Sequence, residues 1–374
     1  MSLKNNRQLW SKNIIWFFVA FYGYNFVIPN EGADGFAYQE RFIEIAHTEL
    51  SSNSFSEYLY GGENGTVDII EPIISYTLAQ FTDNPQILFG VYGIIFGFFY
   101  SRNLWFLLSH NYKWSYTNFI IFILFAFSIG IWEINGFRFW CSCHIFFYGA
   151  FPFIMQGKKK YIIFILLSAF MHFSFLFPIA ILALYYFAGN RVHIYFIFFL
   201  ITFFIAELNV SAVREILTLY LPDIFSTKIE AYTSDVYIDV VEERSANVTI
   251  FNTLSKYMGT FIRVAMLLIV YFNYKKIKNS KPLNSLLSFT LLFYGFANIF
   301  QLIPSGGRFI SAASLFVFSL YFIYTQYSTS LFARRFVYVA SPLILYVVFY
   351  NFKIIAKDTF SLYTFSNPLL NSIF

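Results

Sequence analysis

Residues 158–187, KKKYIIFILLSAFMHFSFLFPIAILALYYF, decide the class of this protein. The apolar stretch 161–187 follows three lysines and is interrupted only by MHFS at 171–174 and by Pro178. A helix needs about 20 apolar residues to cross a bilayer, so a single tilted helix would fit this stretch. Two short helices that meet at the interruption fit it as well, and the order of the charged loops favours this second interpretation.

Similar apolar runs follow one another along the whole chain. Hydrophobic residues make up 58% of the 374 residues and charged residues 12%, whereas a soluble domain carries about 25% charged residues. Open sheet edges are excluded from hydrocarbon, so these runs must be helices. The sequence predicts an all-α, polytopic integral membrane bundle with about ten or eleven transmembrane helices, which forms a single domain over residues 1–374.

The positions of lysine and arginine predict the orientation of the bundle, because positively charged loops remain in the cytoplasm. Basic residues cluster at 4–12, 158–160 and 275–281. With these clusters inside, the apolar runs 86–108 and 139–155 both return to the cytoplasmic face. The turn at 135–138, which precedes the second of these runs, is then external.

The acidic residues gather in two blocks, at 29–68 and 207–250. Both fall on the external side in this topology, so we expect the segments 29–85 and 207–256 to be external. The run 69–82 is short and contains Pro72. We therefore expect it to be a re-entrant or interfacial segment rather than a span.

Neither metal nor nucleotide chemistry has a sequence signal. The chain lacks Walker and Rossmann glycine motifs, and its five histidines show no zinc-binding spacing. Cys141 and Cys143 lie two positions apart in an apolar helix, where they point to different faces and are best explained by packing. We therefore expect no metal site and no cofactor. We also expect no nucleic-acid partner, because the net charge of +5 reflects the positions of the cytoplasmic loops.

Three basic residues at breaks or turns are candidate catalytic residues. They are Arg138 in NGFR, His172 in MHFS and Arg308 in PSGGR, and the topology places all three near the external face. A single arginine at a helix boundary often only extends its charge to the interface. Two such arginines opposite the basic loops suggest a function, and a guanidinium matches a phosphate with two hydrogen bonds.

Four further residues are candidates for substrate binding: Asp34, Glu71, Arg244 and Arg263. A carboxylate in an acidic loop is more often only solvated, although Glu71 precedes Pro72 in the short segment. Arg244 lies in the second acidic block beside two glutamates, which offer it an equally good structural partner. Arg263 lies within the predicted helix 257–273, where it would meet a diphosphate or pair with a carbonyl.

The chain resembles the EpsG-like, Wzy-type polysaccharide polymerases of bacterial O-antigen and capsule clusters. The resemblance rests on ADGFAYQERF at 33–42 with EP at 71–72, NGFRFW at 135–140, MHFSF at 171–175 and GGRFISAASLFVF at 306–318. These stretches are spread over nearly the whole chain in the family's order. The family is similar to lipid-linked sugar transferases of the GT-C class, which implies a helical bundle with a large external loop, here 207–250, over a cavity.

The resemblance also implies a reaction and a location. The protein would be a multi-pass protein of the bacterial inner (plasma) membrane that joins undecaprenyl-pyrophosphate-linked oligosaccharide repeats at the external face. It would be a metal-independent glycosyltransferase, surrounded by membrane lipid, with a chain-length regulator and a flippase as candidate partners. Arg138 and Arg308 would hold the pyrophosphate, and His172 would accept the acceptor's proton or donate a hydrogen bond to phosphate.

Three other functions are also compatible with the sequence. A lipid-linked oligosaccharide flippase would also be helical and lined with basic residues, but we would expect about twice as many spans in two similar halves. A membrane O-acyltransferase would use a histidine such as His172, but would leave the two external arginines unexplained. An O-antigen ligase would use much the same residues as a polymerase.

Overall fold

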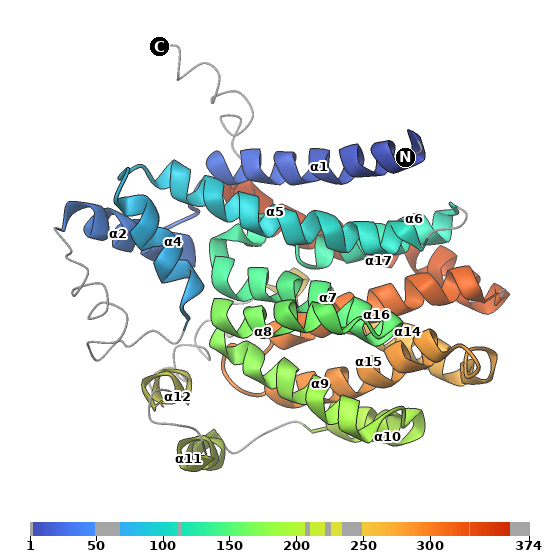
Figure 1. Ribbon diagram of the computed structural model, residues 1–374. Coiled ribbons are helices and arrows are strands. Elements are labelled where there is room, and N and C mark those ends of the chain that lie inside the picture. The colour runs from blue at the N-terminus through green and yellow to red at the C-terminus, as the bar shows by residue number, and fades with distance from the viewer. Residues whose placement is uncertain are drawn as a thin grey trace.

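The computed structural model describes residues 3–48, 68–110, 114–205, 210–220, 226–233, 249–328 and 330–359. Within these ranges the chain forms helices and turns and no strand, which confirms the all-α prediction. The main helices of the bundle lie roughly along one direction (Figure 1). They are α1 (Leu3–Tyr24), α5 (Pro85–Ser109), α6 (Tyr116–Ser128), α7 (Phe137–Gln156), α14 (Ile250–Phe272), α15 (Lys281–Phe300), α16 (Arg308–Tyr327) and α17 (Leu331–Thr359).

Shorter elements complete the bundle and cover one of its ends. Three short apolar helices join the bundle: α8 (Ile162–Met171), α9 (Leu176–Ala188) and α10 (Val192–Phe203). Four more lie at one end of it (Figure 1): α2 (Asp34–His47), α4 (Ile70–Ala79), α11 (Val210–Tyr220) and α12 (Ser226–Thr233). Single 3-10 turns link helices at η1 (Ile131–Gly136), η2 (Lys159–Tyr161), η3 (Phe173–Phe175) and η5 (Tyr274–Lys276).

Six helical segments of the described chain are long and apolar enough to cross a membrane. They are Pro85–Ser109, Tyr116–Gln156, Ile250–Phe272, Lys281–Phe300, Arg308–Tyr327 and Leu331–Lys353. The second segment contains both α6 and α7, and two shorter apolar helices lie at Phe173–Ala188 and Val192–Phe203. The chain is therefore a multi-pass membrane protein, while the number of ten or eleven spans stays a prediction.

The apolar stretch 161–187 folds as two short helices, as the charge order predicted. Helix α8 ends at Met171, and His172 takes an extended backbone conformation with φ −150° and ψ 117°. The turn η3 follows, and α9 begins at Leu176. Pro178 falls in the first turn of α9, where a missing backbone N–H costs no hydrogen bond. The break therefore leaves His172 at the junction of two helices.

Two other boundaries differ from the sequence prediction. The predicted span 116–134 is helical only to Ser128, and the chain continues as η1 after Gly130, which packs against the Trp132 ring. The helix predicted at 14–28 lies instead at Leu3–Tyr24. By contrast, α4 has only 10 residues, or about 15 Å of helix, so it is too short to span, as expected for the run 69–82.

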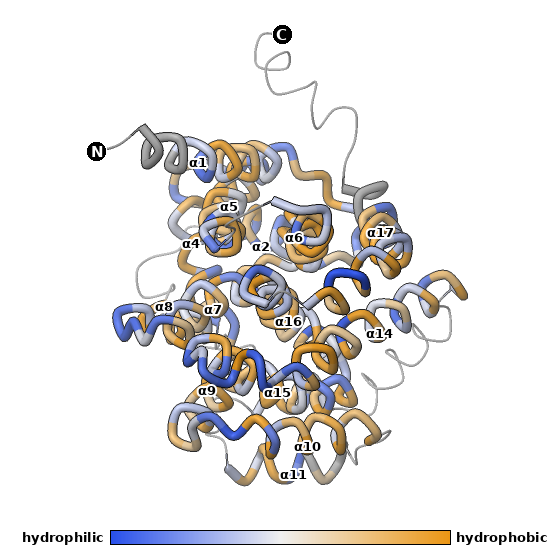
Figure 2. The backbone as a smooth tube through the Cα atoms, turned by 90° about the vertical axis from the view of Figure 1, so that its right-hand side faces the viewer, coloured by the Kyte–Doolittle hydropathy of each residue, from blue (hydrophilic) through white to orange (hydrophobic). Residues whose placement is uncertain are grey.

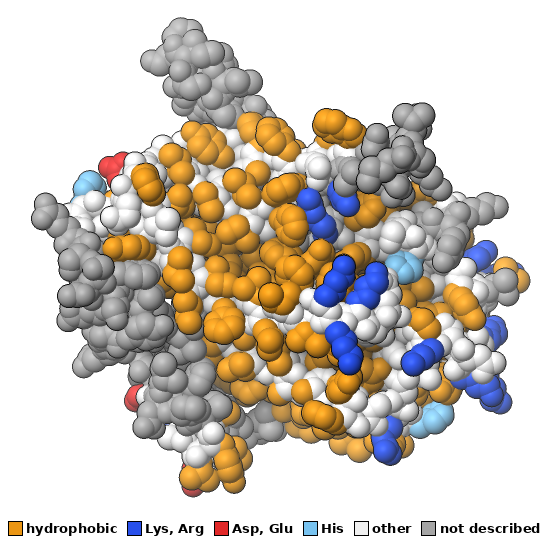
Figure 3. All heavy atoms as spheres, viewed as in Figure 1, with side chains coloured by type: hydrophobic (Ala, Val, Ile, Leu, Met, Phe, Trp, Pro, Cys, Tyr) orange, Lys and Arg blue, Asp and Glu red, His pale blue; other side chains and the backbone are white. Residues whose placement is uncertain are grey.

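The two ends of the bundle carry different residues. Arg138 and Lys158 flank α7, and Lys281 and Arg308 lie at opposite ends of the α15 helix and its following turn. We call the end with Arg138 and Arg308 the site end and the other the lysine end. On the face shown in Figure 3, Lys and Arg gather toward one end and the few visible Asp and Glu toward the other.

The core of the bundle consists of aromatic packing around α16. Phe146 and Phe147 from α7 contact Phe316 of α16, which also meets Phe289 and Phe293 of α15. An end-on view places α16 among its neighbours, with α14 and α17 nearer the edge (Figure 2). In the most apolar stretch of α16, 83% of the residues are buried inside the bundle, whereas the corresponding share is 39% in both α14 and α17. Helices α14 and α17 therefore offer the larger surface to lipid.

Candidate functional site

The first two resemblance stretches meet at the site end. The backbone N–H of Gly35, in the first turn of α2, donates a hydrogen bond of 3.1 Å to Oδ1 of Asn135 in η1. A Cβ atom on Gly35 would lie only 2.7 Å from this oxygen, so a larger residue here would displace the Asn135 side chain. Asp34 is exposed, and its carboxylate lies against Gly136. The sequences ADGF and NGFR thus form one contact.

Arg138 is held by a buried carboxylate. Its Nη1 donates to Oδ2 of Asp68 at 3.1 Å, and its Nε donates to the Tyr38 hydroxyl at 3.2 Å. The guanidinium also lies over the Tyr38 ring. Asp68 is only 2% exposed, and burial raises the pKa of Tyr38, so its phenol stays protonated. The charge of Arg138 is therefore already balanced within the protein.

Asp68 joins this arginine to the histidine stretch. Its second oxygen, Oδ1, accepts a hydrogen bond of 2.7 Å from the backbone N–H of Phe173. Its neighbour Ile69 donates a backbone hydrogen bond to the carbonyl of Phe170 at 3.0 Å. These contacts fix the helix break at His172 against the start of α7. NGFRFW and MHFSF are thereby placed side by side.

Glu71 is buried between helices and hydrogen-bonded within the protein. Its side chain is completely buried, and its Oε1 accepts hydrogen bonds from the Tyr92 hydroxyl at 2.7 Å and from Ser75 at 2.8 Å. Arg41 of α2 lies 3.7 Å from Oε2. The carboxylate thus fastens α4 to α5 and α2. The structure gives Glu71 no surface through which to reach a substrate directly.

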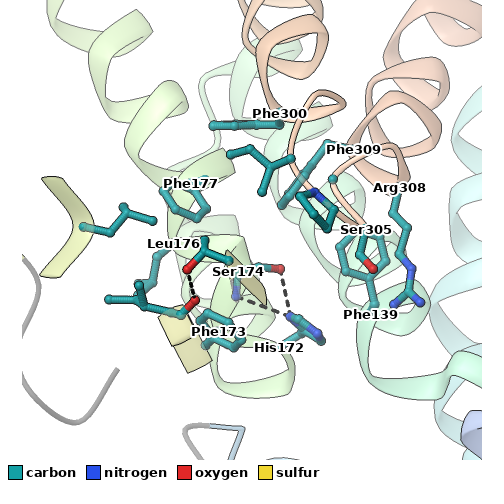
Figure 4. Close-up of a pocket in the computed structure, with 16 residues that line it drawn as sticks. Phe139, His172, Phe173, Ser174, Leu176, Phe177, Phe300, Ser305, Arg308 and Phe309 are labelled. Atoms are coloured by element: carbon teal, nitrogen blue, oxygen red, sulfur yellow. Dashed lines mark hydrogen bonds between the residues drawn. The ribbon is translucent and has the colours of Figure 1, made fainter. Parts of the chain in front are cut away.

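Arg308 and His172 face each other across the ring of Phe139 (Figure 4). The Arg308 guanidinium lies 5.8 Å from the centre of this ring, and the His172 ring meets its edge at 5.3 Å. Among the described residues the Arg308 guanidinium forms no hydrogen bond and no ion pair, although its backbone N–H donates to the Ser305 carbonyl at 3.4 Å. Unlike Arg138, it has a guanidinium available for an anionic ligand.

These side chains border an apolar cavity of about 160 Å³. Its walls come from η3 and α9, from the turn between α15 and α16, and from α11 and α12. Most of the walls are aromatic or aliphatic side chains, such as Phe173, Phe177, Leu217 and Phe300. Its polar lining includes His172, Ser174, Ser305 and Arg308. A ligand that joins an apolar chain to an anionic group fits this combination.

The hydrogen bonds of His172 indicate its tautomer. Its Nδ1 lies 3.3 Å from the backbone N–H of Ser174, which donates to it, and 2.8 Å from the Ser174 hydroxyl. A nitrogen that accepts from an amide carries no proton, so the neutral ring carries its proton on Nε2. The ring is thus arranged as a hydrogen-bond donor at Nε2.

Glu133 belongs to the site end and was not predicted to be a site residue. It lies in η1, within electrostatic range of Arg308 and of Asp34. A signal for it was present in the sequence, because Glu133 is a rare acid outside the two acidic blocks and stands two residues before the NGFR turn.

The remaining candidates lie elsewhere. Arg263 of α14 contacts a second cavity between α6, α14, α16 and α17. Its Nε donates to the Tyr294 hydroxyl at 3.1 Å and its Nη2 to Thr260 at 3.1 Å. Arg244 lies outside the described residues. Within those residues, no group of three or more His, Cys, Asp or Glu side chains is arranged to hold a metal ion.

Comparison with known families decides the relationship of this chain. The profile of the EpsG family matches residues 13–367, which include all four resemblance stretches. The chain belongs to the EpsG family. EpsG proteins are associated with exopolysaccharide synthesis. No curated protein and no solved structure matches the chain. The EpsG match confirms the family, and Wzy-type polymerase activity stays a prediction.

Proposed function

We propose that this EpsG protein is a polysaccharide polymerase of the bacterial inner membrane. It would join undecaprenyl-pyrophosphate-linked oligosaccharide repeats at the external face, for O-antigen or capsule. The observation that carries the proposal is Arg308, an arginine at the edge of an apolar cavity that forms no ion pair with any carboxylate in the described part of the chain. The cavity suits the isoprenoid units next to the pyrophosphate, and Arg308 suits the pyrophosphate itself.

The proposed reaction is a displacement at the anomeric carbon of the donor glycan. A hydroxyl oxygen of the acceptor repeat bonds to this carbon, and the bond from carbon to the pyrophosphate oxygen breaks. Negative charge then develops on the leaving pyrophosphate, where Arg308 stabilises it. A donor fixed in advance at the point of developing charge is usually the largest contribution to catalysis. Arg138 serves this step indirectly, by holding the break at His172 in place through Asp68.

His172 acts in this proposal as a hydrogen-bond donor to the phosphate. The acceptance of the Ser174 N–H by Nδ1 leaves the proton on Nε2, which favours donation over proton acceptance. The hydroxyl proton then needs another base, and we assign it to Glu133 of η1, the turn that leads directly into Arg138 at the start of α7. Glu133→Gln should abolish polymer at normal protein levels. Wild-type polymer in this variant would exclude Glu133 as the base.

Gene deletion and gel analysis of the surface polysaccharide test the proposed function. Loss of a polymerase leaves lipid A core with a single repeat unit, or lipid-linked single repeats if the product is capsule. Loss of every repeat, with the lipid-linked unit still on the cytoplasmic leaflet, would indicate a flippase. Full-length polymer that remains on its lipid carrier would indicate a ligase. Polymer of normal length that lacks only acyl groups would indicate an O-acyltransferase.

A further inference from the structure

A second cavity lies inside the bundle, separate from the apolar one beside His172. Its volume is about 90 Å³, which exceeds the roughly 10–15 Å³ that a single water requires. It is bounded by α6, α14, α16 and α17, which are neighbours in the end-on view (Figure 2). Its polar lining comes from Ser128, Arg263, Ser311, Ser314 and Asn351. Two of its walls, α14 and α17, are the helices with the larger lipid-facing surface.

The Arg263 side chain extends along this cavity toward the site end. Helical side chains tilt toward the N-terminus of their helix, and α14 begins at the site end. Accordingly, Nη1 of Arg263 lies beside Gly259, one turn closer to that end. Within the described chain, Nε and Nη2 are engaged by Tyr294 and Thr260, whereas Nη1 has no hydrogen bond.

The other groups in the cavity add donors and no negative charge. Oδ1 of Asn351 accepts from Ser255 at 3.1 Å, which leaves its Nδ2 group as a donor. The Ser311 hydroxyl also lines the cavity and is a further hydrogen-bond donor. No carboxylate lines the cavity, and no described carboxylate pairs with Arg263. An arginine within a membrane helix is costly without compensation, so this set of groups is suited to an oxygen-rich anion.

The cavity lies next to the proposed catalytic site. Ser311, Ser314 and Phe318 form one stripe on α16, three, six and ten residues after Arg308. Arg308 itself lines the apolar cavity. Two cationic sites therefore flank the beginning of α16, with Arg308 beside Phe139 of α7 and Arg263 on α14.

We propose that this second cavity binds a phosphate group of a polyprenyl lipid, which enters from the lipid-facing side at α14 and α17. The inference rests on the proposed function, because a reaction between two carrier-linked glycans requires two carriers to be held at once. Arg308 then serves the carrier that leaves, and Arg263 serves the other. The shared chemistry is a phosphate, and its source is the headgroup of a lipid carrier.

Binding of farnesyl diphosphate to the purified full-length protein tests this inference without any polymerisation. We expect two binding sites in the wild type and one in Arg308→Gln. Adding Arg263→Gln to Arg308→Gln should weaken the remaining site by about ten- to a hundredfold, the value of a lost charged hydrogen bond. Ser314→Leu fills the cavity but keeps Arg263. In the Arg308→Gln background it should weaken the remaining site equally, so the inference can still be tested if the Arg263→Gln protein does not fold. Arg335→Gln at the lysine end is the matched control.

The ligands separate the alternatives. Farnesol should not compete for the Arg263 site, and equal binding of farnesol would overturn the inference by showing a purely apolar site. Inorganic pyrophosphate that binds as tightly as farnesyl diphosphate would refute the lipid as the source. Unchanged binding after Arg263→Gln and after Ser314→Leu would refute the site altogether. Two farnesyl diphosphate sites in a protein whose deletion leaves polymer intact would instead refute the proposed polymerase and leave the phosphate site standing.

Discussion

Arg138 and Arg308 share one end of the bundle but differ in their charge partners. Arg138 donates to Asp68 and Tyr38, whereas the Arg308 guanidinium lies over the Phe139 ring, lines the cavity and forms no ion pair with a described residue. A buried charge that is already paired has less to gain from a ligand than an unpaired one. We therefore assign direct contact with pyrophosphate to Arg308 and a positioning role to Arg138.

The Arg308→Lys substitution separates charge from geometry. Lysine keeps the positive charge but cannot form two parallel hydrogen bonds to a phosphate. The loss of this contact in the transition state should lower the polymerisation rate about a hundredfold. Arg335→Lys, an exposed position at the lysine end, should leave polymer length unchanged at equal protein levels. A normal polysaccharide ladder from Arg308→Lys would contradict the phosphate contact.

The Asp68→Ala substitution should act mainly on stability. It leaves the Arg138 charge and the Phe173 N–H without their acceptor, and removing one partner of a buried ion pair costs about 3 kcal/mol or more. Thermal or denaturant unfolding in detergent measures this loss. Replacing Arg138 by Met in the same variant should recover part of it. Unchanged stability of Asp68→Ala would show that the pair does not hold the helix break in place.

The sequence allowed some of these residues to be found and concealed others. Arg138, His172 and Arg308 were recognisable because each is a polar residue beside a break in an apolar run. Asp68 was not, because it is one of many acids in the block 29–68 and only the folded chain shows which acid reaches Arg138. Glu71 was recognised, but its burial against Tyr92 depends on the packing of α4, which no local pattern indicates.

Among the elements, the turn between α15 and α16 positions Arg308. Gly306 lies so close to the Phe300 carbonyl oxygen that a Cβ atom would overlap it, whereas Gly307 has open space around it. Backbone cannot yield as a flexible side chain can. Gly306→Ala should therefore destabilise the protein by about 1–3 kcal/mol and reduce polymer formation by shifting Arg308. Gly307→Ala is the matched control, and equal effects of the two variants would contradict this role of the turn.

Helix boundaries were predictable where polar residues or proline interrupt an apolar run. The break at His172 is marked by a histidine, a serine and Pro178 within otherwise apolar sequence. The end of α6 at Ser128 carries a weaker mark, since only Ser128 and Gly130 interrupt an apolar pattern that continues through Ile129 and Ile131. The chain leaves the helix before Gly130, where the ring of Trp132, two residues later, folds back over the glycine. Periodicity alone cannot reveal a contact of this kind.

At the scale of the whole molecule, the four resemblance stretches converge although up to 285 residues separate them, from 33 to 318. Their convergence follows from alternation, because α7 and α16 begin at the site end and α8 ends there, while α2 and α4 lie wholly at that end. The alternation depends on α8 and α9 being two helices. A single helix over 161–187 would have placed Arg308 at the opposite end from Arg138.

The last prediction concerns the orientation of the bundle. Helix α7 has 20 residues, or about 30 Å, which matches the hydrocarbon thickness, so its two ends face opposite sides of the membrane. Basic loops remain cytoplasmic, which predicts that the site end is external. Gly307→Cys and Lys159→Cys, both at exposed positions, report the two ends.

These cysteines are introduced after the buried Cys141 and Cys143 have been replaced by Ala, in a background that still makes polymer. An impermeant thiol reagent should label Gly307→Cys in sealed spheroplasts, because the site end is external. It should label Lys159→Cys only after the membrane is permeabilised. Labelling of Lys159→Cys in sealed spheroplasts would contradict the predicted orientation. Arg308 would then face the cytoplasm, where exported repeats are not present to be joined.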